Sequence, residues 1–165
     1  MPKLEPPDSH HLSAALGWLE LGNPREAQAE LDRLPSGLRE CPEALLVRWE
    51  IEAKAKDWEK SLETARALVA AAPHEPDGWI KLSFSLHELK RTREALDNLL
   101  AIEERFPKIS IVPYNLACYS CQLGDQPEAL RRLVKAFKLG GKEQIKSMAL
   151  TDLDLKPLWE EILKL

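Results

Sequence analysis

The stretch from Pro76 to Ile109 reads PDGWIKLSFSLHELKRTREALDNLLAIEERFPKI. The spacing i, i+3, i+4, i+7 predicts one face of a helix, and the residues at that spacing are Trp79, Leu82, Ser83 and Leu86. Thr92 suits a helix N-cap, and a second stripe of Ala95, Leu99 and Ile102 follows before Pro107. The stretch therefore predicts a helix–turn–helix hairpin, in which the small Ser83 and Ala95 let the two helices approach closely.

Small residues recur at the same place in four such segments: Ala27, Ser61, Ala95 and Ala129 follow one another at a constant interval of 34. A fixed period of this length indicates stacked hairpins. We expect units at residues 8–41, 42–75, 76–109 and 110–143, after an N-terminal tail at residues 1–7. Because the last unit would expose its inner side, we expect capping helices at residues 144–165.

The hairpin at residues 76–109 resembles the tetratricopeptide repeat, whose pattern is W-x2-L-G-x2-Y, then A-x3-F, then P. Ser83 stands at the position of the glycine, and Leu86 and Leu99 stand at the positions of the two aromatic residues. The resemblance implies an all-α fold, a right-handed superhelix (α-solenoid) of four tetratricopeptide-like units. It also implies a protein that binds other proteins and is not an enzyme.

Two of the units depart from the pattern. In the second unit, strict register places Arg48 and Trp49 where leucine and glycine belong. We therefore expect a one-residue slip that turns Leu46, Trp49 and Ala53 inward. In the first unit, the run Pro35-Ser36-Gly37 predicts that the second helix ends a turn early.

The composition fits a folded domain in a reducing cytoplasm. The 165 residues are 44% apolar and 30% charged, with a formal charge of −4. This charge is too small to predict a nucleic-acid partner. No apolar run approaches the ~18 residues of a membrane span, and residues 1–7 lack the apolar core of a signal peptide. The three cysteines do not form a disulfide framework.

Cys118 and Cys121 form the one motif that could indicate an enzyme, a thiol redox protein. A redox pair needs a thiolate stabilised by a helix N-terminus or a cation. This pair lies inside a predicted helix without basic neighbours, which favours a packing role. Cys41 and the four histidines form no ligand spacing with the pair. We expect no metal, no cofactor and no catalytic residue.

A basic cluster lies near the C-terminus. Between Ala129 and Leu150, six basic residues stand against one acidic residue: Arg131, Arg132, Lys135, Lys138, Lys142 and Lys146 against Glu143. We do not expect this cluster to stack nucleic-acid bases. We interpret the cluster as a solvated helix face, with an anionic partner as the alternative.

In the tetratricopeptide-repeat family, the first helix of each unit lines a concave groove. The residues left over after the packing stripe is assigned are the candidates for that groove: Leu12, Leu16, Leu46, Glu50, Ile80, Phe84, His87, Tyr114 and Cys118. This set is rich in apolar and aromatic side chains, which is typical of a binding surface. We predict an interaction scaffold that binds a peptide or helical segment of a partner protein.

Three alternatives remain open at this point. The C-terminal helix could fold back over the groove, or a second copy could cover it in a homodimer. The size and the apolar groove also resemble those of bacterial secretion chaperones that use this repeat. Some domains of this family bind the acidic tails of chaperones with a clamp of basic and amide side chains. The matching positions here are Leu12, Leu16, Val47 and Lys81, and only Lys81 is suitable. We therefore expect no such clamp.

Overall fold

The computed structural model describes residues 5–165, which contain ten α-helices, two short 3-10 helices and no strand. The described part of the chain is therefore all-α, as predicted. Residues 1–4 of the predicted N-terminal tail lie outside the described residues. The helices are α1 (Asp8–Glu20), α2 (Pro24–Leu31), η1 (Ser36–Leu38), α3 (Pro42–Lys54), α4 (Trp58–Ala71), α5 (Pro76–Glu88), α6 (Thr92–Ile102), α7 (Ile111–Gln122), α8 (Gln126–Gly140), α9 (Lys142–Ala149), η2 (Leu153–Leu158) and α10 (Trp159–Lys164).

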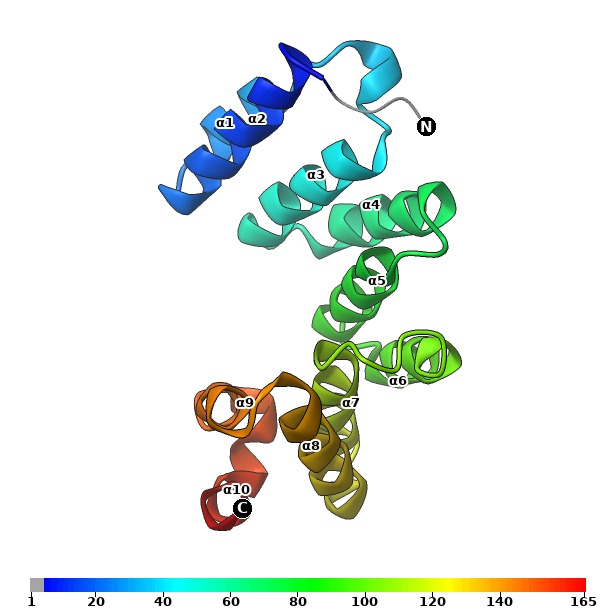
Figure 1. Ribbon diagram of the computed structural model, residues 1–165, viewed down its shortest axis with the longest axis vertical. Helices are drawn as coiled ribbons and strands as arrows, with labels where there is room; N and C mark the ends of the chain where they lie inside the picture. Colours follow the sequence, from blue (N-terminus) through cyan, green and yellow to red (C-terminus); the bar gives the residue numbers. More distant parts are fainter. Residues whose placement is uncertain (1–4) are drawn as a thin grey trace. The chain divides into compact units, whose positions relative to one another are not determined.

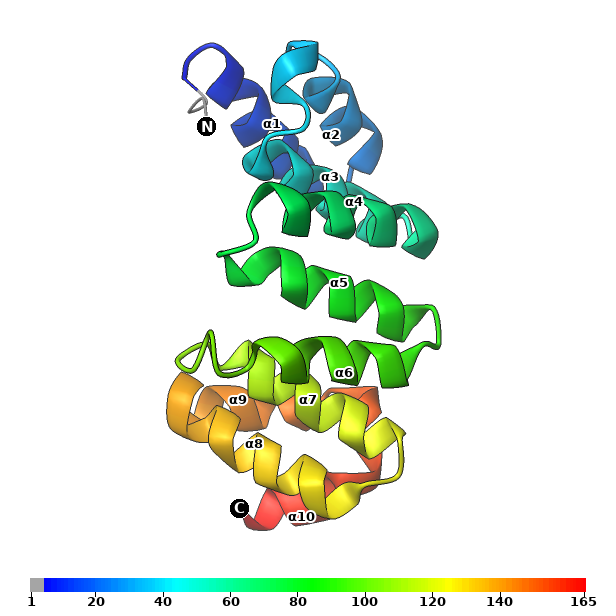
Figure 2. The same cartoon turned by 90° about the vertical axis from the view of Figure 1, so that its right-hand side faces the viewer.

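The chain divides into two compact units, residues 1–85 and residues 86–165, with the boundary inside α5. In the first unit, α1 packs on α2 and α3 packs on α4 (Figure 1). In the second unit, α7 packs on α8, and η2 lies against α7 (Figure 2). Each unit therefore builds its core from hairpins of consecutive helices.

The turn between the two helices of each hairpin has one conformation in all four repeats. The residue with positive φ comes at intervals of 34, at Gly22 (φ 74°), Lys56 (57°), Lys90 (64°) and Gly124 (87°). Two of these positions hold lysine, although the left-handed region favours glycine. The backbone thus repeats with the same period as the sequence.

The residue after each positive-φ position is the N-cap of the second helix of the hairpin. The side chains of Asn23, Asp57 and Asp125 each accept a hydrogen bond from the backbone N–H three residues on. Arg91 holds this position in the third repeat and makes no such cap. The predicted N-cap, Thr92, is wrong by one residue, because the period of 34 places the cap position at Arg91. The Thr92 hydroxyl lies 3.0 Å from His87 Nδ1 instead.

The small residues that revealed the period are fully buried, as helix packing requires. Ala27, Ser61, Ala95 and Ala129 are each 0% exposed. The second helix of the first hairpin ends at Leu31, and η1 follows Pro35. The early end predicted from that proline is therefore confirmed.

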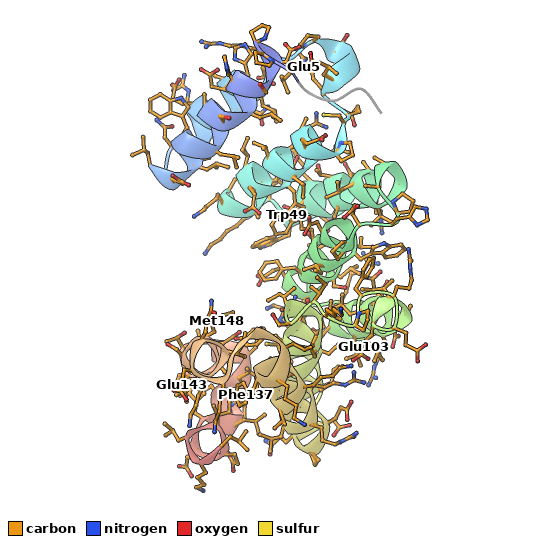
Figure 3. The ribbon with its side chains drawn as sticks, in the orientation of Figure 1. Glu5, Trp49, Glu103, Phe137, Glu143 and Met148 are labelled. Atoms are coloured by element: carbon orange, nitrogen blue, oxygen red, sulfur yellow. The ribbon has the colours of Figure 1, made fainter. Side chains whose placement is uncertain are left out.

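The one-residue slip predicted for the second repeat is wrong. The first residues of α3 and α5, Pro42 and Pro76, keep the period of 34, and Leu45, not Leu46, is fully buried. Strict register is possible because Trp49 directs its ring toward α5 (Figure 3). Its Nε1 donates a hydrogen bond of 3.0 Å to Ser85 Oγ. The large ring therefore fills the space next to the following helix.

Candidate functional site

The first unit contains an apolar hollow of about 420 Å³, which we call the N-terminal hollow. This volume falls in the range of about 300–1,000 Å³ that is typical of ligand sites. The hollow lies on helices α1, α3 and α5. Its lining consists of Leu12, Leu16, Glu43, Leu46, Val47, Glu50, Asp77 and Lys81.

The lining of the N-terminal hollow repeats with the period of the fold. Its members form pairs separated by the same interval of 34: Leu12 with Leu46, Leu16 with Glu50, Glu43 with Asp77, and Val47 with Lys81. Each pair occupies the same position on consecutive first helices. Because the turns and helix starts share this period, the fold brings the pairs to one surface.

Leu16 is the most exposed apolar residue of this lining. Its side chain is 46% exposed in the middle of α1. A second hollow of about 270 Å³ adjoins at Leu16 and Glu50 and adds Leu19, Glu20 and Lys54. A contiguous apolar surface of this kind marks a site where another molecule can bind.

Lys81 is held in place by two neighbours on α3. Its Nζ donates a hydrogen bond of 2.6 Å to Glu50 Oε1 and lies 3.9 Å from the centroid of the Trp49 ring. The Lys81 side chain is only 16% exposed. Its charge is thus engaged inside the first unit, by an ion pair and a cation–π contact.

Phe84, another predicted groove residue, belongs to an aromatic cluster. Its ring lies edge-on to Trp49 and to Trp58, with centroid distances of 5.9 and 5.8 Å. Ile80 is half-buried on the same helix. Neither residue lines the N-terminal hollow, and the contacts of Phe84 indicate a packing role.

The predicted groove residues of the second unit are covered by the chain itself. Tyr114 donates a hydrogen bond of 2.8 Å to Asp152 Oδ2, and Cys118 Sγ lies 3.5 Å from the same oxygen. His87 Nε2 lies 2.9 Å from Asp154 Oδ2. The C-terminal segment therefore occupies this face, as the fold-back alternative predicts for this part of the chain.

The surroundings of the two neighbouring cysteines oppose the redox hypothesis. Cys118 and Cys121 are buried on α7. Burial raises the pKa of both thiols, and the carboxylates of Asp152 and Asp154 raise these pKa values further. Both residues therefore stay in the thiol form near neutral pH, whereas redox catalysis requires a thiolate.

The basic cluster is largely engaged within the second unit. Arg132 Nη1 and Lys135 Nζ donate hydrogen bonds of 2.5 and 2.7 Å to the two oxygens of Glu103. Arg131 forms an ion pair with Glu128, which Arg132 also contacts. Glu103, at the C-terminal end of α6 (Figure 3), thereby ties α6 to α8. The sequence predicts a solvated helix face, whereas these contacts give Arg132 and Lys135 a role in joining two helices.

Two classes of feature are absent from residues 5–165. No three or more histidine, cysteine or acidic residues are grouped so that they could hold a metal ion. No helix in this part of the chain has the length and apolar character needed to cross a membrane.

The nine predicted groove residues thus fall into two groups. Leu12, Leu16, Leu46 and Glu50 meet at the N-terminal hollow. The others lie elsewhere: Ile80, Phe84, His87, Tyr114 and Cys118. Sequence reasoning missed Glu43, which lies on the charged rim of the hollow with Asp77, although the period of 34 connects these two residues.

Comparison with solved structures identifies the fold. A thermophilic tetratricopeptide-repeat protein from Thermus thermophilus is 21% identical, with a TM-score of 0.71 over 96% of this chain and 100% of that chain. The protein MamA from Desulfovibrio magneticus RS-1, from residue 41 to its end, is 17% identical, with a TM-score of 0.72 over 98% and 94%. YrrB, a tetratricopeptide-repeat protein with an unusual peptide-binding site, is 14% identical, with a TM-score of 0.68 over 87% and 74%.

These similarities confirm the fold predicted from the sequence. The chain has the helical-repeat fold of tetratricopeptide-repeat proteins. No protein-family model matches the sequence, and no curated protein matches it significantly.

Proposed function

We propose that the protein is an interaction scaffold that binds a segment of a partner protein in the N-terminal hollow. The observation that carries this proposal is the lining itself, in which leucines from consecutive repeats form one surface around the exposed Leu16. YrrB, which shares the fold, has a peptide-binding site. That neighbour supports peptide binding as a use of such a surface.

The size of the hollow predicts a modest affinity. Burying an apolar side chain contributes about 1.5–3 kcal/mol. Association itself costs about 4–15 kcal/mol. Two or three buried anchors contribute about 3–9 kcal/mol, so after this cost at most about 5 kcal/mol remains, which corresponds to a dissociation constant of roughly 0.1–1 mM before any contribution from rim contacts. This range suits a scaffold whose partners exchange.

We further propose that the protein has no catalytic activity and works in the cytoplasm. The raised pKa values of the Cys118 and Cys121 thiols support the absence of redox catalysis. Free, buried cysteines are suited to a reducing compartment.

The test of this function compares two variants that carry the same leucine-to-glutamate substitution at different places. Leu16→Glu places a charge in the N-terminal hollow, and Leu163→Glu places one on α10, where Leu163 is 62% exposed. Cross-linking capture from the native cell should recover the same partner with the wild-type protein and with Leu163→Glu, and lose it with Leu16→Glu. Undiminished capture by Leu16→Glu, with unchanged helical circular dichroism, would contradict the proposal.

A further inference from the structure

The rim of the N-terminal hollow carries a pair of equivalent carboxylates. Glu43 and Asp77 are separated by the period of 34, and each follows a proline, Pro42 or Pro76, in the first turn of its helix. Both side chains line the hollow. The repeat thus places two acidic groups beside the leucines.

The basic group of the same hollow does not neutralise this pair. Lys81 is bonded to Glu50 at 2.6 Å, as described above. Among residues 5–165, neither Glu43 nor Asp77 forms an ion pair with a basic side chain. Three carboxylates and one ammonium group line the hollow, so its formal charge is −3 + 1 = −2.

A purely structural reason for these carboxylates exists as well. An acidic residue in the first turn of a helix interacts favourably with the helix dipole. Other helices of the chain also carry one there, among them α1, α2, α4, α6 and α8. This effect accounts for the sign of the charge on each helix, but it gives no preference for the charge of a bound segment. The two roles can therefore be separated by varying the charge of the ligand.

We propose that the occupant of the N-terminal hollow is an apolar segment carrying lysine or arginine next to its apolar side chains. The leucines of the hollow take the apolar side chains, and Glu43 and Asp77 pair with the basic ones. Complementary charges at a rim increase specificity and the rate of association. This inference rests on the function proposed above and adds the chemical class of the partner.

A random dodecapeptide display library, selected on the full chain, tests this inference. The bound pool should be enriched in leucine, isoleucine and phenylalanine, and in lysine and arginine over aspartate and glutamate. The variant Glu43→Gln/Asp77→Asn should keep the apolar enrichment and lose the basic one. Glu59→Gln/Asp97→Asn removes the same charge from α4 and α6 and should behave as the wild type.

Affinity measurements on the most enriched peptide give the second readout. Replacing the basic residues of this peptide with glutamate should weaken its binding to the wild-type protein about five- to tenfold at low salt. The same replacement should change binding to Glu43→Gln/Asp77→Asn much less. A helix-dipole role alone would leave the peptide's charge without effect on either protein.

The outcomes separate this inference from the function on which it rests. Apolar enrichment without a basic preference, abolished by Leu16→Glu, would overturn the charge inference and leave the binding function standing. An acidic preference would do the same. Selection of no sequence above background, or selection that Leu16→Glu does not change, would overturn both.

Discussion

The Tyr114 hydroxyl donates a hydrogen bond of 2.8 Å to Asp152 Oδ2, joining α7 to a residue 38 positions later in the chain. Burial is the main cause that raises the pKa of Tyr114, and the neighbouring Cys118 and Asp152 add to it, so the hydroxyl stays protonated and acts as a donor. This bond fixes the C-terminal segment on the face of α7 that carries Tyr114. The interaction surface that we propose consequently lies in the first unit.

Asp152→Ala should destabilise the protein by about 2–3 kcal/mol. The change leaves the buried Tyr114 hydroxyl without its acceptor and removes the cap that Asp152 Oδ1 provides to the backbone N–H of Asp154. Urea unfolding monitored by circular dichroism measures the loss. Asp97→Ala, at an exposed position on α6, should change stability by less than about 0.5 kcal/mol. Equal stability of the two variants would mean that the C-terminal segment is only loosely held.

Glu103→Gln should lower stability near pH 7 by about 1–2 kcal/mol. Burial raises the pKa of this carboxyl, but hydrogen bonds from Lys135 and Arg132 outweigh that effect, and its pKa is lowered overall. The exposed neighbour offers a matched control, Glu104→Gln, which should have little effect. Urea midpoints of the three proteins provide the measurement.

The effect of Glu103→Gln should depend on pH with a definite sign. Because the folded-state pKa lies below that of the unfolded chain, the unfolded chain takes up the proton first as the pH falls. The stability from Glu103 is therefore fully present above about pH 4.5 and is lost as the pH falls through the folded-state pKa. The difference between wild type and variant should shrink in that window. A difference that stays constant down to acid unfolding would disprove this role.

At the positive-φ positions of the four hairpin turns, replacing glycine with alanine and replacing lysine with glycine should have opposite effects on stability. Gly22→Ala and Gly124→Ala should each destabilise the fold by about 1 kcal/mol, because alanine is strained at a positive φ. The added Cβ meets no other atom, so this backbone strain is the whole cost. Lys56→Gly and Lys90→Gly should be neutral or stabilising by up to about 1 kcal/mol, because glycine relieves the left-handed backbone. Thermal unfolding of the four variants measures these changes. Destabilisation by both lysine-to-glycine changes would contradict the account of the turns.

The native cysteines should react slowly with a maleimide near pH 7. Burial raises the pKa of the thiols of Cys41, Cys118 and Cys121, and all three side chains are shielded. Mass spectrometry over time should show rapid labelling only after unfolding in urea. Fast labelling of Cys118 or Cys121 in the native protein would revive the redox hypothesis.

The fold could be predicted because small residues recur in the sequence at the period of the repeat. Where two helices cross closely only a small side chain fits, so the fully buried Ala27, Ser61, Ala95 and Ala129 mark the hairpins. Trp49 shows the limit of this reasoning. Its size suggests that the second repeat is shifted by one residue, whereas the ring lies against α5 and donates a hydrogen bond to Ser85. A contact with the following helix cannot be derived from the spacing within one helix.

The candidate site could be predicted only in part for a similar reason. Leu12, Leu16 and Leu46 are the residues left after the packing stripe is assigned, and this reasoning is local to each helix. The cover over Tyr114 comes from Asp152, whose contact spans 38 residues and leaves no trace in the repeat pattern.

The most direct test of the central claim is a nuclear magnetic resonance titration of the isotope-labelled full chain with the most enriched display peptide. We predict that the chemical-shift changes concentrate on Leu12, Leu16, Leu46 and Glu50 and vanish in Leu16→Glu. Changes concentrated on α8 and α9, or changes that persist unaltered in Leu16→Glu, would contradict the claim that the N-terminal hollow binds the partner.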